Sequence, residues 1–324
     1  MEKQTVDLII PTYQPDEKFS LLLQALQGQT CVVHKVIIMN TEENCWTDFV
    51  KKYRAEKLLQ KLPVELHHIP KKEFDHGGTR MQGVSYSDAP YFICMTQDAV
   101  PADNYLIANL CKAIGGTTST GAPVAAGYAR QLAAGSSSLM ENYMRQFNYP
   151  PRCRIKEKKD LEELGIKTFF CSNVCAVYNR EIFDKLGGFE KRTIFNEDMI
   201  YAGHAVYAGY GIAYAADALV VHSHNYTARQ QKKRYFDLGV SQAQHPEVFA
   251  EVKSESEGMK SVAATAKYLL KKKKPLQIFS LISQNLAKYV GYKKGFHYKK
   301  LKKNQILKYT SNKGYWNKQE WDTE

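Results

Sequence analysis

YFICMTQDAV, residues Tyr91–Val100, joins a run of β-forming residues to an abrupt polar turn. The run Tyr91–Met95 is apolar and contains aromatic and β-branched side chains, so it predicts a buried strand. The polar triplet Thr96-Gln97-Asp98 follows at once, and Ala99-Val100-Pro101 comes after it. The carboxylate of Asp98 is therefore expected at the mouth of a buried strand, and this position calls for a functional explanation.

Short apolar runs of this kind alternate with helical patterns along the first two thirds of the chain. The runs that we predict to be strands are Val6–Tyr13, Lys35–Asn40, Val64–Ile69, Tyr91–Met95, Pro123–Ala129 and Asn173–Asn179. Helical patterns fit residues 19–30, Tyr105–Ile114, Ser138–Gln146, Arg180–Leu186 and Asp198–Ala208. This alternation predicts an α/β fold with a mostly parallel sheet flanked by helices. In such sheets ligands bind at the carboxyl ends of the strands.

Composition and length limit the class of protein. The 324 residues are 44% hydrophobic, which is enough for a sizeable core in one large α/β domain with an extension, or in two smaller domains. The seven cysteines include no C-x-x-C pair, which is typical of reduced thiols in a cytoplasmic protein. The first residues contain too short an apolar run for a signal peptide, and no run of about 18 apolar residues occurs. We therefore expect a cytoplasmic site.

The positive charge of the chain is concentrated near its C-terminus. The net charge is +12, and the segment Lys271–Lys308 alone holds twelve lysines and no aspartate or glutamate. This shift in composition predicts a catalytic domain in residues 1–257 and a basic, helical C-terminal extension in residues 258–324.

The extension has two possible uses. Its apolar residues recur at helical spacing between lysine clusters, as in an amphipathic helix that lies on an anionic membrane surface; they are Phe279, Ile282, Leu286 and Tyr289. Alternatively the helix packs on the catalytic domain and the lysines are solvated, and both can hold at once. A basic module that binds nucleic acid is the competing hypothesis, because aromatic residues such as Tyr292 and Phe296 accompany the lysines. That hypothesis does not explain acids at strand ends, so we expect no nucleic-acid partner.

Two further features follow predicted strands. Pro11-Thr12-Tyr13 closes the first strand, and EFDHGGTRMQG, residues Glu73–Gly83, follows the third. The pair Gly77-Gly78 allows either a loop that approaches a phosphate or nucleotide closely, or a turn that begins a helix with Arg80 as a solvated charge. No G-x-G-x-x-G follows the first strand and no G-x-x-x-x-G-K-[ST] occurs, which disfavours dinucleotide-binding oxidoreductases and P-loop kinases.

The motifs IIPTYQP, EFDHGGTR, TQDAVP, NREIFDKLGGF, NEDMIYAGHAVYAGY and VVHSHNYT follow one another in the order typical of a known family. Over residues 5–240 the chain resembles family-2 glycosyltransferases with the GT-A nucleotide-sugar-binding fold. FDHGGTR and TQDA are similar to bacterial rhamnosyltransferases of surface polysaccharide synthesis. The resemblance implies inverting transfer of a 6-deoxyhexose, L-rhamnose from dTDP-L-rhamnose, to a growing surface polysaccharide. Another hexose or an N-acetylhexosamine is the alternative. The basic extension predicts docking at the inner face of the cell membrane, where a lipid-linked acceptor would lie.

The resemblance also implies a donor site with a divalent cation, Mg²⁺ or Mn²⁺. Asp98 corresponds to the metal-binding acid of the family's D-x-D motif, although Gln97 and Ala99 flank it here. His222 or His224 supplies a second ligand or a phosphate contact in this interpretation, and a structural hydrogen bond in the alternative one. Glu42 lies where the family often has an acid for the nucleobase. The residues expected to bind the nucleotide sugar are Pro11, Thr12, Tyr13, Asn40, Asp75, Gly77, Arg80, Gln97 and Asp98.

The catalytic residues implied by the resemblance are Glu197 and Asp198, with Asp198 as the general base that takes the proton from an acceptor hydroxyl. The alternative is a helix start that Asn196 caps, with two acids in the first turn. Gly187, Gly188 and Phe189 are expected beside the acceptor, or as an ordinary helix C-cap. QKKRY, residues 231–235, is loosely similar to the Q-x-x-R-W motif of processive family members.

Overall fold

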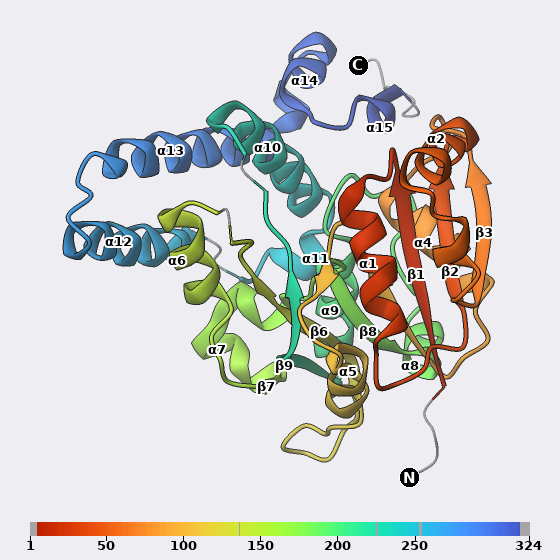
Figure 1. The fold of residues 1–324 in the computed structure, drawn as a ribbon. Coiled ribbons are helices and arrows are strands. Elements are labelled where there is room, and N and C mark those ends of the chain that lie inside the picture. Colours follow the sequence, from red (N-terminus) through yellow and green to blue (C-terminus); the bar gives the residue numbers. More distant parts are fainter. Residues whose placement is uncertain (1–4, 136, 225, 253–254, 318–324) are drawn as a thin grey trace.

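The computed structural model describes residues 5–135, 137–224, 226–252 and 255–317 (Figure 1). In this part of the chain the strands form one nine-stranded sheet in the order β3-β2-β1-β4-β8-β6-β9-β5, with β7 paired to β9. The strands are β1 (Val6–Tyr13), β2 (Val36–Thr41), β3 (Val64–Ile69), β4 (Tyr91–Met95), β5 (Val100–Pro101), β6 (Val124–Leu132), β7 (Arg154–Lys156), β8 (Cys175–Asn179) and β9 (Gly211–Val221).

The sheet is mixed, and this corrects the expectation of a mostly parallel one. The pairs β3-β2, β2-β1, β1-β4 and β6-β9 are parallel, whereas β4-β8, β8-β6, β9-β5 and β7-β9 are antiparallel. The parallel half contains the strands that were predicted most accurately, since β1, β3 and β4 have the predicted bounds. The sequence did not identify β5, β7 or β9 as strands. β5 and β7 are too short to show the alternation of apolar and polar residues by which a strand is recognised in a sequence.

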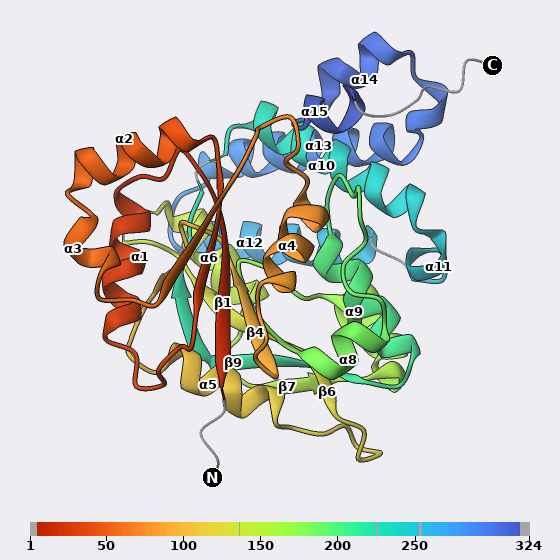
Figure 2. The same cartoon turned by 90° about the vertical axis from the view of Figure 1, so that its right-hand side faces the viewer.

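Helices cover both faces of the sheet (Figure 2). They are α1 (Glu17–Gln27), α2 (Glu43–Tyr53), α3 (Glu56–Leu59), α4 (His76–Ser85), α5 (Leu106–Ile114), α6 (Leu139–Asn148), α7 (Leu161–Leu164), α8 (Arg180–Lys185), α9 (Glu197–Tyr207), α10 (Ala228–Gln244), α11 (Pro246–Phe249), α12 (Glu255–Lys271), α13 (Gln277–Phe296), α14 (Lys303–Tyr309) and α15 (Lys313–Asn317). Alternate strand residues separate two cores: Leu8 packs with α1, α2 and α5, whereas Ile9 packs on the side of α8 and α9.

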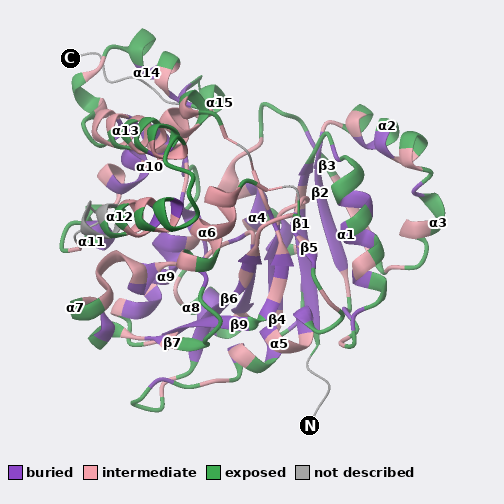
Figure 3. Cartoon of the chain, turned by 60° about the vertical axis from the view of Figure 1, so that its left-hand side comes forward, coloured by how far each residue is buried: buried purple, intermediate pink, exposed green. Residues whose placement is uncertain are grey.

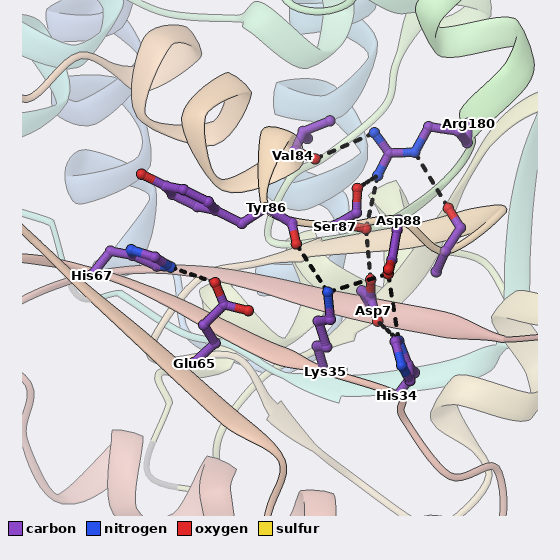
Figure 4. A network of polar contacts seen from close by, with 11 residues as sticks. Asp7, His34, Lys35, Glu65, His67, Val84, Tyr86, Ser87, Asp88 and Arg180 are labelled. Atoms are coloured by element: carbon purple, nitrogen blue, oxygen red, sulfur yellow. Dashed lines mark hydrogen bonds and ion pairs between the residues drawn. The ribbon is translucent and has the colours of Figure 1, made fainter.

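A polar network fastens the edge of the sheet at which β1 and β4 begin (Figure 4). The buried carboxylate of Asp7 accepts a hydrogen bond from Ser87 Oγ at 2.7 Å and lies 3.1 Å from His34 Nδ1. Arg180, the first residue of α8, donates to Ser87 Oγ at 2.8 Å. The network therefore joins β1, the turn before β4 and α8, at the edge opposite the strand ends that were expected to bind ligand.

The C-terminal helices pack on the rest of the chain. α12 meets α6 through Tyr268 and Tyr143, whose rings stack at 4.1 Å. α13 lies along α10 so closely that a Cβ on Gly291 or Gly295 would overlap the main chain of Lys232 or Phe236. The predicted boundary between residues 257 and 258 falls within α12.

The packing of the C-terminal helices buries side chains on both sides of the contact (Figure 3). A third hydrophobic cluster joins Phe236 and Val240 of α10 to Ile306 of α14 and Trp316 of α15. In the described ranges, no helix combines the length and the apolar character needed to cross a membrane.

Candidate active site

Side chains at the ends of β1, β2 and β4 are joined by hydrogen bonds. Thr12 Oγ1 donates to Asn40 Oδ1 at 3.0 Å, and both side chains are buried. The amide of Gln97 pairs with the main chain of Tyr13, accepting from its N–H at 2.8 Å and donating to its carbonyl at 3.1 Å. Tyr13 is exposed and accepts a hydrogen bond from Lys71 Nζ at 2.7 Å. The structure thus brings together four of the residues predicted to bind the nucleotide sugar.

Asp98 lies beside two histidines. His224 Nε2 is 3.3 Å from Asp98 Oδ2, and His222 Nε2 is 3.6 Å from Asp98 Oδ1. One ligand atom from each of the three residues lies within 4.8 Å of the others. The pairing of β5 with β9 creates this cluster, because it sets Val100 opposite Val221. One carboxylate and two imidazoles that converge in this way fit a divalent cation.

The two imidazoles are suited to ligate a metal. Burial lowers the pKa of His222 to about 3, against the opposing attraction of Asp98, and it also lowers the pKa of His224. His222 Nδ1 lies 3.1 Å from Gln131 Oε1 and can donate to it, which leaves Nε2 with a lone pair toward Asp98. A neutral imidazole whose other nitrogen is hydrogen-bonded is the usual form of a histidine ligand. Gln131 also donates to Ser172 Oγ at 3.1 Å and thereby orients the cluster.

Glu197 and Asp198 begin α9 and have different partners. Glu197 is only 5% exposed, and its Oε1 receives Arg80 Nη1 and Asn173 Nδ2, each at 3.0 Å. Asp198 is partly exposed; its Oδ2 accepts from the Asn173 N–H and its Oδ1 from the Met199 N–H, each at 2.8 Å. Asn196 makes no side-chain cap to the helix. The two acids do lie in the first turn of α9, as the helix-start alternative predicts, but the cap by Asn196 is absent.

The pKa values of the two carboxyl groups are driven apart. Burial raises the pKa of Asp198 to about 7, and the negative charge of Glu197 adds to this effect. Burial also opposes ionisation of Glu197, but the positive charge of Arg80 and the Asn173 hydrogen bond keep its pKa below the usual value. Two neighbouring carboxyl groups whose pKa values are separated in this way are typical of acid–base sites. Asp198 is the group that can exchange a proton near neutral pH.

The EFDHGGTR motif forms a helix start. Asp75 caps α4 by accepting the Gly78 N–H at 2.7 Å, and a Cβ on Gly77 would overlap the carbonyl oxygen of Glu190. The close approach that Gly77 permits is therefore to the protein's own main chain. Arg80 is buried against Glu197, which corrects the alternative in which it is a solvated charge.

Phe189 was expected beside the acceptor and is instead a core residue. It is 2% exposed and packs edge-on against Tyr178 and Phe183, with ring centroids 5.1 and 4.8 Å away. Gly187 and Gly188 have φ of +84° and +75° and end α8, as the C-cap alternative predicts. This correction has a physical cause: an aromatic residue after a Gly-Gly turn can point to either side, and local sequence does not say which.

A cavity of about 970 Å³ adjoins the candidate metal cluster, since His224 is part of its wall. Its other walls come from α6, the segment 149–156, the start of α10 and α13. The sequence analysis singled out one part of this wall, the motif QKKRY. No motif in the sequence pointed to Arg145, Tyr149 or Lys288. They depend on how the C-terminal helices pack.

The mixed sheet flanked by helices, with the Asp98 cluster at its strand ends, fits a glycosyltransferase with the GT-A fold. A model of the family "Glycosyl transferase family 2" matches residues 7–187, and the chain belongs to this family.

Two relatives match almost the whole chain. The chain is 36% identical over 315 residues to the O-antigen chain rhamnosyltransferase RfbN of Salmonella typhimurium (strain LT2), with 96% of each chain covered. It is 34% identical over 313 residues to the O-antigen chain rhamnosyltransferase WbaN of Salmonella anatum, covering 96% of this chain and 95% of the relative.

Solved structures with low sequence identity share the fold. The mannosyltransferase PcManGT from Pyrobaculum calidifontis, in complex with GDP-Man and Mn²⁺, matches with a TM-score of 0.60 at 14% identity, over 91% of this chain and 88% of that one. TarS residues 1–349 of S. aureus, in complex with UDP-GlcNAc, match with a TM-score of 0.50 at 12% identity, over 90% of each chain. Identities this low support the fold alone.

Proposed function

We propose that the protein transfers L-rhamnose from dTDP-L-rhamnose, with inversion, to a growing lipid-linked surface polysaccharide. The observation that carries the proposal is the Asp198 carboxylate at the start of α9, which is partly exposed and held by the Asn173 and Met199 N–H groups; burial raises its pKa to about 7. The near full-length similarity to two rhamnosyltransferases supports rhamnose over other hexoses and N-acetylhexosamines. Attack from the face opposite the leaving group converts a β-linked donor into an α-L-rhamnoside.

Asp198 acts as the general base in this proposal. It removes the proton from an acceptor hydroxyl while the hydroxyl oxygen attacks the anomeric carbon. The Asn173 and Met199 N–H groups fix the orientation of its carboxylate. Glu197 positions this unit instead of exchanging a proton, because it is buried and neutralised by Arg80.

The donor site lies at the ends of β1, β2 and β4. Thr12, Asn40 and Gln97 supply its polar groups, Pro11 precedes Thr12 in β1, and the exposed ring of Tyr13 borders its mouth. Asp75, Gly77 and Arg80, which were expected to contact the donor directly, support the site by shaping α4 and by holding Glu197.

Asp98, His224 and His222 would hold a divalent cation at this site. A bound cation supplies Lewis-acid neutralisation of the charge that grows on the departing nucleoside diphosphate. The donor set favours Mn²⁺ over Mg²⁺, because Mg²⁺ prefers oxygen ligands whereas two of the three ligands here are imidazoles.

The proposal also includes the place where the enzyme meets a lipid-linked acceptor. We place the enzyme at the inner face of the cytoplasmic membrane, docked on anionic lipid through the C-terminal extension from residue 258 onward. Support comes from α13, where Phe279, Ile282, Leu286 and Tyr289 are 73, 55, 60 and 54% exposed. They lie on the side opposite Gly291 and Gly295, which pack on α10.

A thermal-shift panel of nucleotide sugars, with and without Mn²⁺ or Mg²⁺, tests the donor assignment. We expect dTDP-L-rhamnose with Mn²⁺ to raise the melting temperature most, because a ligand of the native state stabilises it in proportion to the logarithm of its concentration. A larger shift with a UDP- or GDP-linked hexose would overturn the assignment of the donor.

A further inference from the structure

Gln131 links the candidate metal cluster with the segment that holds the candidate base. It lies near the end of β6, is 3% exposed, and its side-chain amide contacts three other parts of the chain. The amide oxygen Oε1 lies 3.1 Å from His222 Nδ1 and accepts a hydrogen bond from Arg145 Nη1 of α6. The amide nitrogen Nε2 donates to Ser172 Oγ at 3.1 Å. One buried side chain is therefore bonded to the metal cluster, to α6 and to the segment before β8.

Arg145 decides how the amide of Gln131 is oriented. A guanidinium has only N–H donors, so the amide atom that faces it must be the oxygen. With the oxygen on this side, the amide nitrogen has to face Ser172, whose hydroxyl oxygen can accept from it. The reversed amide would set its NH₂ group against the guanidinium, where neither group can accept a hydrogen bond. The contacts of the amide are therefore consistent with one orientation only.

The orientation of the amide in turn determines the tautomer of His222. An amide oxygen can only accept, so Nδ1 must carry the proton of the neutral ring. Nε2 is then unprotonated, and it is this nitrogen that lies 3.6 Å from Asp98 Oδ1. Asp98 and His222 therefore present two acceptors to each other, which is the arrangement that a cation between them would stabilise.

The other end of the amide supports the candidate base. Ser172 directly precedes Asn173, whose main-chain N–H donates to Asp198 Oδ2 at 2.8 Å. The buried side chain of Asn173 donates to Glu197 Oε1 at 3.0 Å. The hydrogen bond from Gln131 is thus made one residue before the partner that both acids share.

We propose that Gln131 is a positioning residue for both tasks of the site, cation binding and proton removal. Its amide oxygen keeps Nε2 of His222 free for the cation, and its amide nitrogen holds the segment that presents Asn173 to Asp198. Arg145 keeps the amide in the orientation that both tasks need. The inference rests on the proposed function, because it concerns the cation and the base of that reaction.

The tautomer of His222 tests the inference without metal or substrate. In nitrogen-15 NMR of the histidine-labelled full chain at neutral pH, protonated and unprotonated ring nitrogens give separate signals, and those of His222 are identified by their loss in His222→Asn. We expect Nδ1 to carry the proton in the wild type. In Arg145→Met the amide can reverse and Nε2–H can donate to Asp98, so the other tautomer should appear. A wild-type ring protonated at Nε2, or an unchanged tautomer in Arg145→Met, would overturn the proposal.

Calorimetric titration with dTDP, with and without Mn²⁺, tests the consequence for the cation. Gln131→Met removes the acceptor and should reduce the gain in dTDP affinity that Mn²⁺ provides by about tenfold or more, as is usual when a metal-ligating histidine loses its hydrogen-bond partner. Gln131→Glu keeps acceptors for His222 and Arg145 and should retain the gain. Gln82→Met, at an exposed glutamine of α4, is the matched control and should change nothing. Retention of the gain in Gln131→Met, or an equal loss in Gln131→Glu, would contradict the positioning role.

Ser172→Ala separates the two tasks. It leaves His222 and its amide partner in place, so the effect of Mn²⁺ on dTDP binding should persist. The value of kcat should fall about fivefold or more with an unchanged KM for the donor, because the segment that holds the base loses one hydrogen bond. An unchanged kcat would reject the link to the base. If Mn²⁺ does not increase dTDP affinity in the wild-type chain, the cation assignment of the proposed function is wrong, while the tautomer of His222 still decides the role of Gln131 and Arg145.

Discussion

Asp198 and Glu197 are neighbours in sequence, yet their environments differ. Arg80 reaches Glu197 from α4 and compensates its charge, whereas Asp198 keeps a partly exposed carboxylate held by two main-chain N–H groups. The uncompensated member of the pair has the pKa that suits a base at neutral pH. In the proposed mechanism, a difference in partners, and not in residue type, therefore distinguishes the base from the residue that positions it.

Replacement of the base is the most direct test at this scale. Asp198→Asn keeps the hydrogen-bond acceptor but removes the ionisable group, so transfer should fall by about 10²-fold or more while nucleoside diphosphate binding is retained. Initial rates and calorimetric titration measure the two quantities. Asp184→Asn, an exposed acid of α8, serves as the control and should transfer at the wild-type rate. A wild-type rate in Asp198→Asn would reduce the pair to a structural feature.

The pKa of Asp198 also predicts a pH dependence. Its raised pKa means that the carboxyl group becomes protonated as the pH falls through about 7, and the protonated form cannot accept a proton. The rate at saturating substrates should therefore fall about tenfold for each pH unit below roughly pH 6. Nucleoside diphosphate affinity measured over the same range separates this effect from loss of donor binding. A rate independent of pH between 5 and 8 would contradict the role.

Asp98 is expected to make donor binding dependent on metal. In Asp98→Ala the two remaining imidazoles lack the carboxylate ligand, so Mn²⁺ should no longer increase the affinity for dTDP. A matched control exists at the opposite edge of the sheet, where Asp7, His34 and Asp88 form a second group with metal-ligand spacing. Asp88→Ala should leave the Mn²⁺ effect intact. The hypothesis fails if Asp98→Ala retains it.

At the scale of elements, α13 presents two different faces. Its glycines lie against α10 and allow the two main chains to approach closely, whereas Phe279, Ile282, Leu286 and Tyr289 face away from that contact. Lysines 271–274 precede the helix, and Lys293 and Lys294 lie in its last turn. Packing on the catalytic part and exposure of an amphipathic face therefore occur in the same helix.

Vesicle binding tests this exposed face. The full chain should co-sediment with anionic vesicles at low salt and far less with neutral ones, since each lysine near an anionic surface contributes roughly 1 kcal/mol. The double variant Phe279→Ser, Leu286→Ser should lower the partition coefficient about tenfold or more, because two buried side chains are lost from the interface. Val32→Ser with Leu21→Ser, exposed apolar residues elsewhere, is the matched control. Wild-type protein that stays in the supernatant with anionic vesicles would exclude membrane docking.

At the scale of the molecule, the third hydrophobic cluster joins the catalytic part to the C-terminus. Phe236 and Val240 belong to α10, and Ile306 and Trp316 to the last two helices. Asp237, on the same helix, accepts hydrogen bonds from Thr310 Oγ1 at 2.6 Å and from the Ser311 N–H at 2.9 Å. The division between residues 257 and 258 that charge suggests is therefore crossed by a buried core.

Trp316→Ala tests whether the two parts unfold together. Deletion of this fully buried ring should lower the free energy of unfolding by about 3–5 kcal/mol. Urea unfolding followed by circular dichroism should show one transition, shifted as a whole. Tyr105→Ala, which removes an exposed ring, should shift it little. A separate early transition with the remainder unchanged would instead support two independently folding domains.

The sequence by itself determined the local elements and the family. β1, β3 and β4 were predicted with their observed bounds, because a strand buried on both faces is recorded in its own sequence as a short run of β-forming residues. Asp98 was singled out because it directly follows a strand pattern, whereas the role expected of Asp198 came from the resemblance to the family.

The tertiary structure alone decided which residues meet. Asp98 reaches His222 and His224 only because β9 returns beside β5, Glu197 is neutralised because α4 delivers Arg80 to it, and Phe189 turned out to be buried. The same holds for the cavity, whose wall needs α13 beside α10. The periodicity of a sequence indicates which side of a helix or strand is apolar. It does not indicate which distant segment covers that side, because this depends on how the whole chain packs.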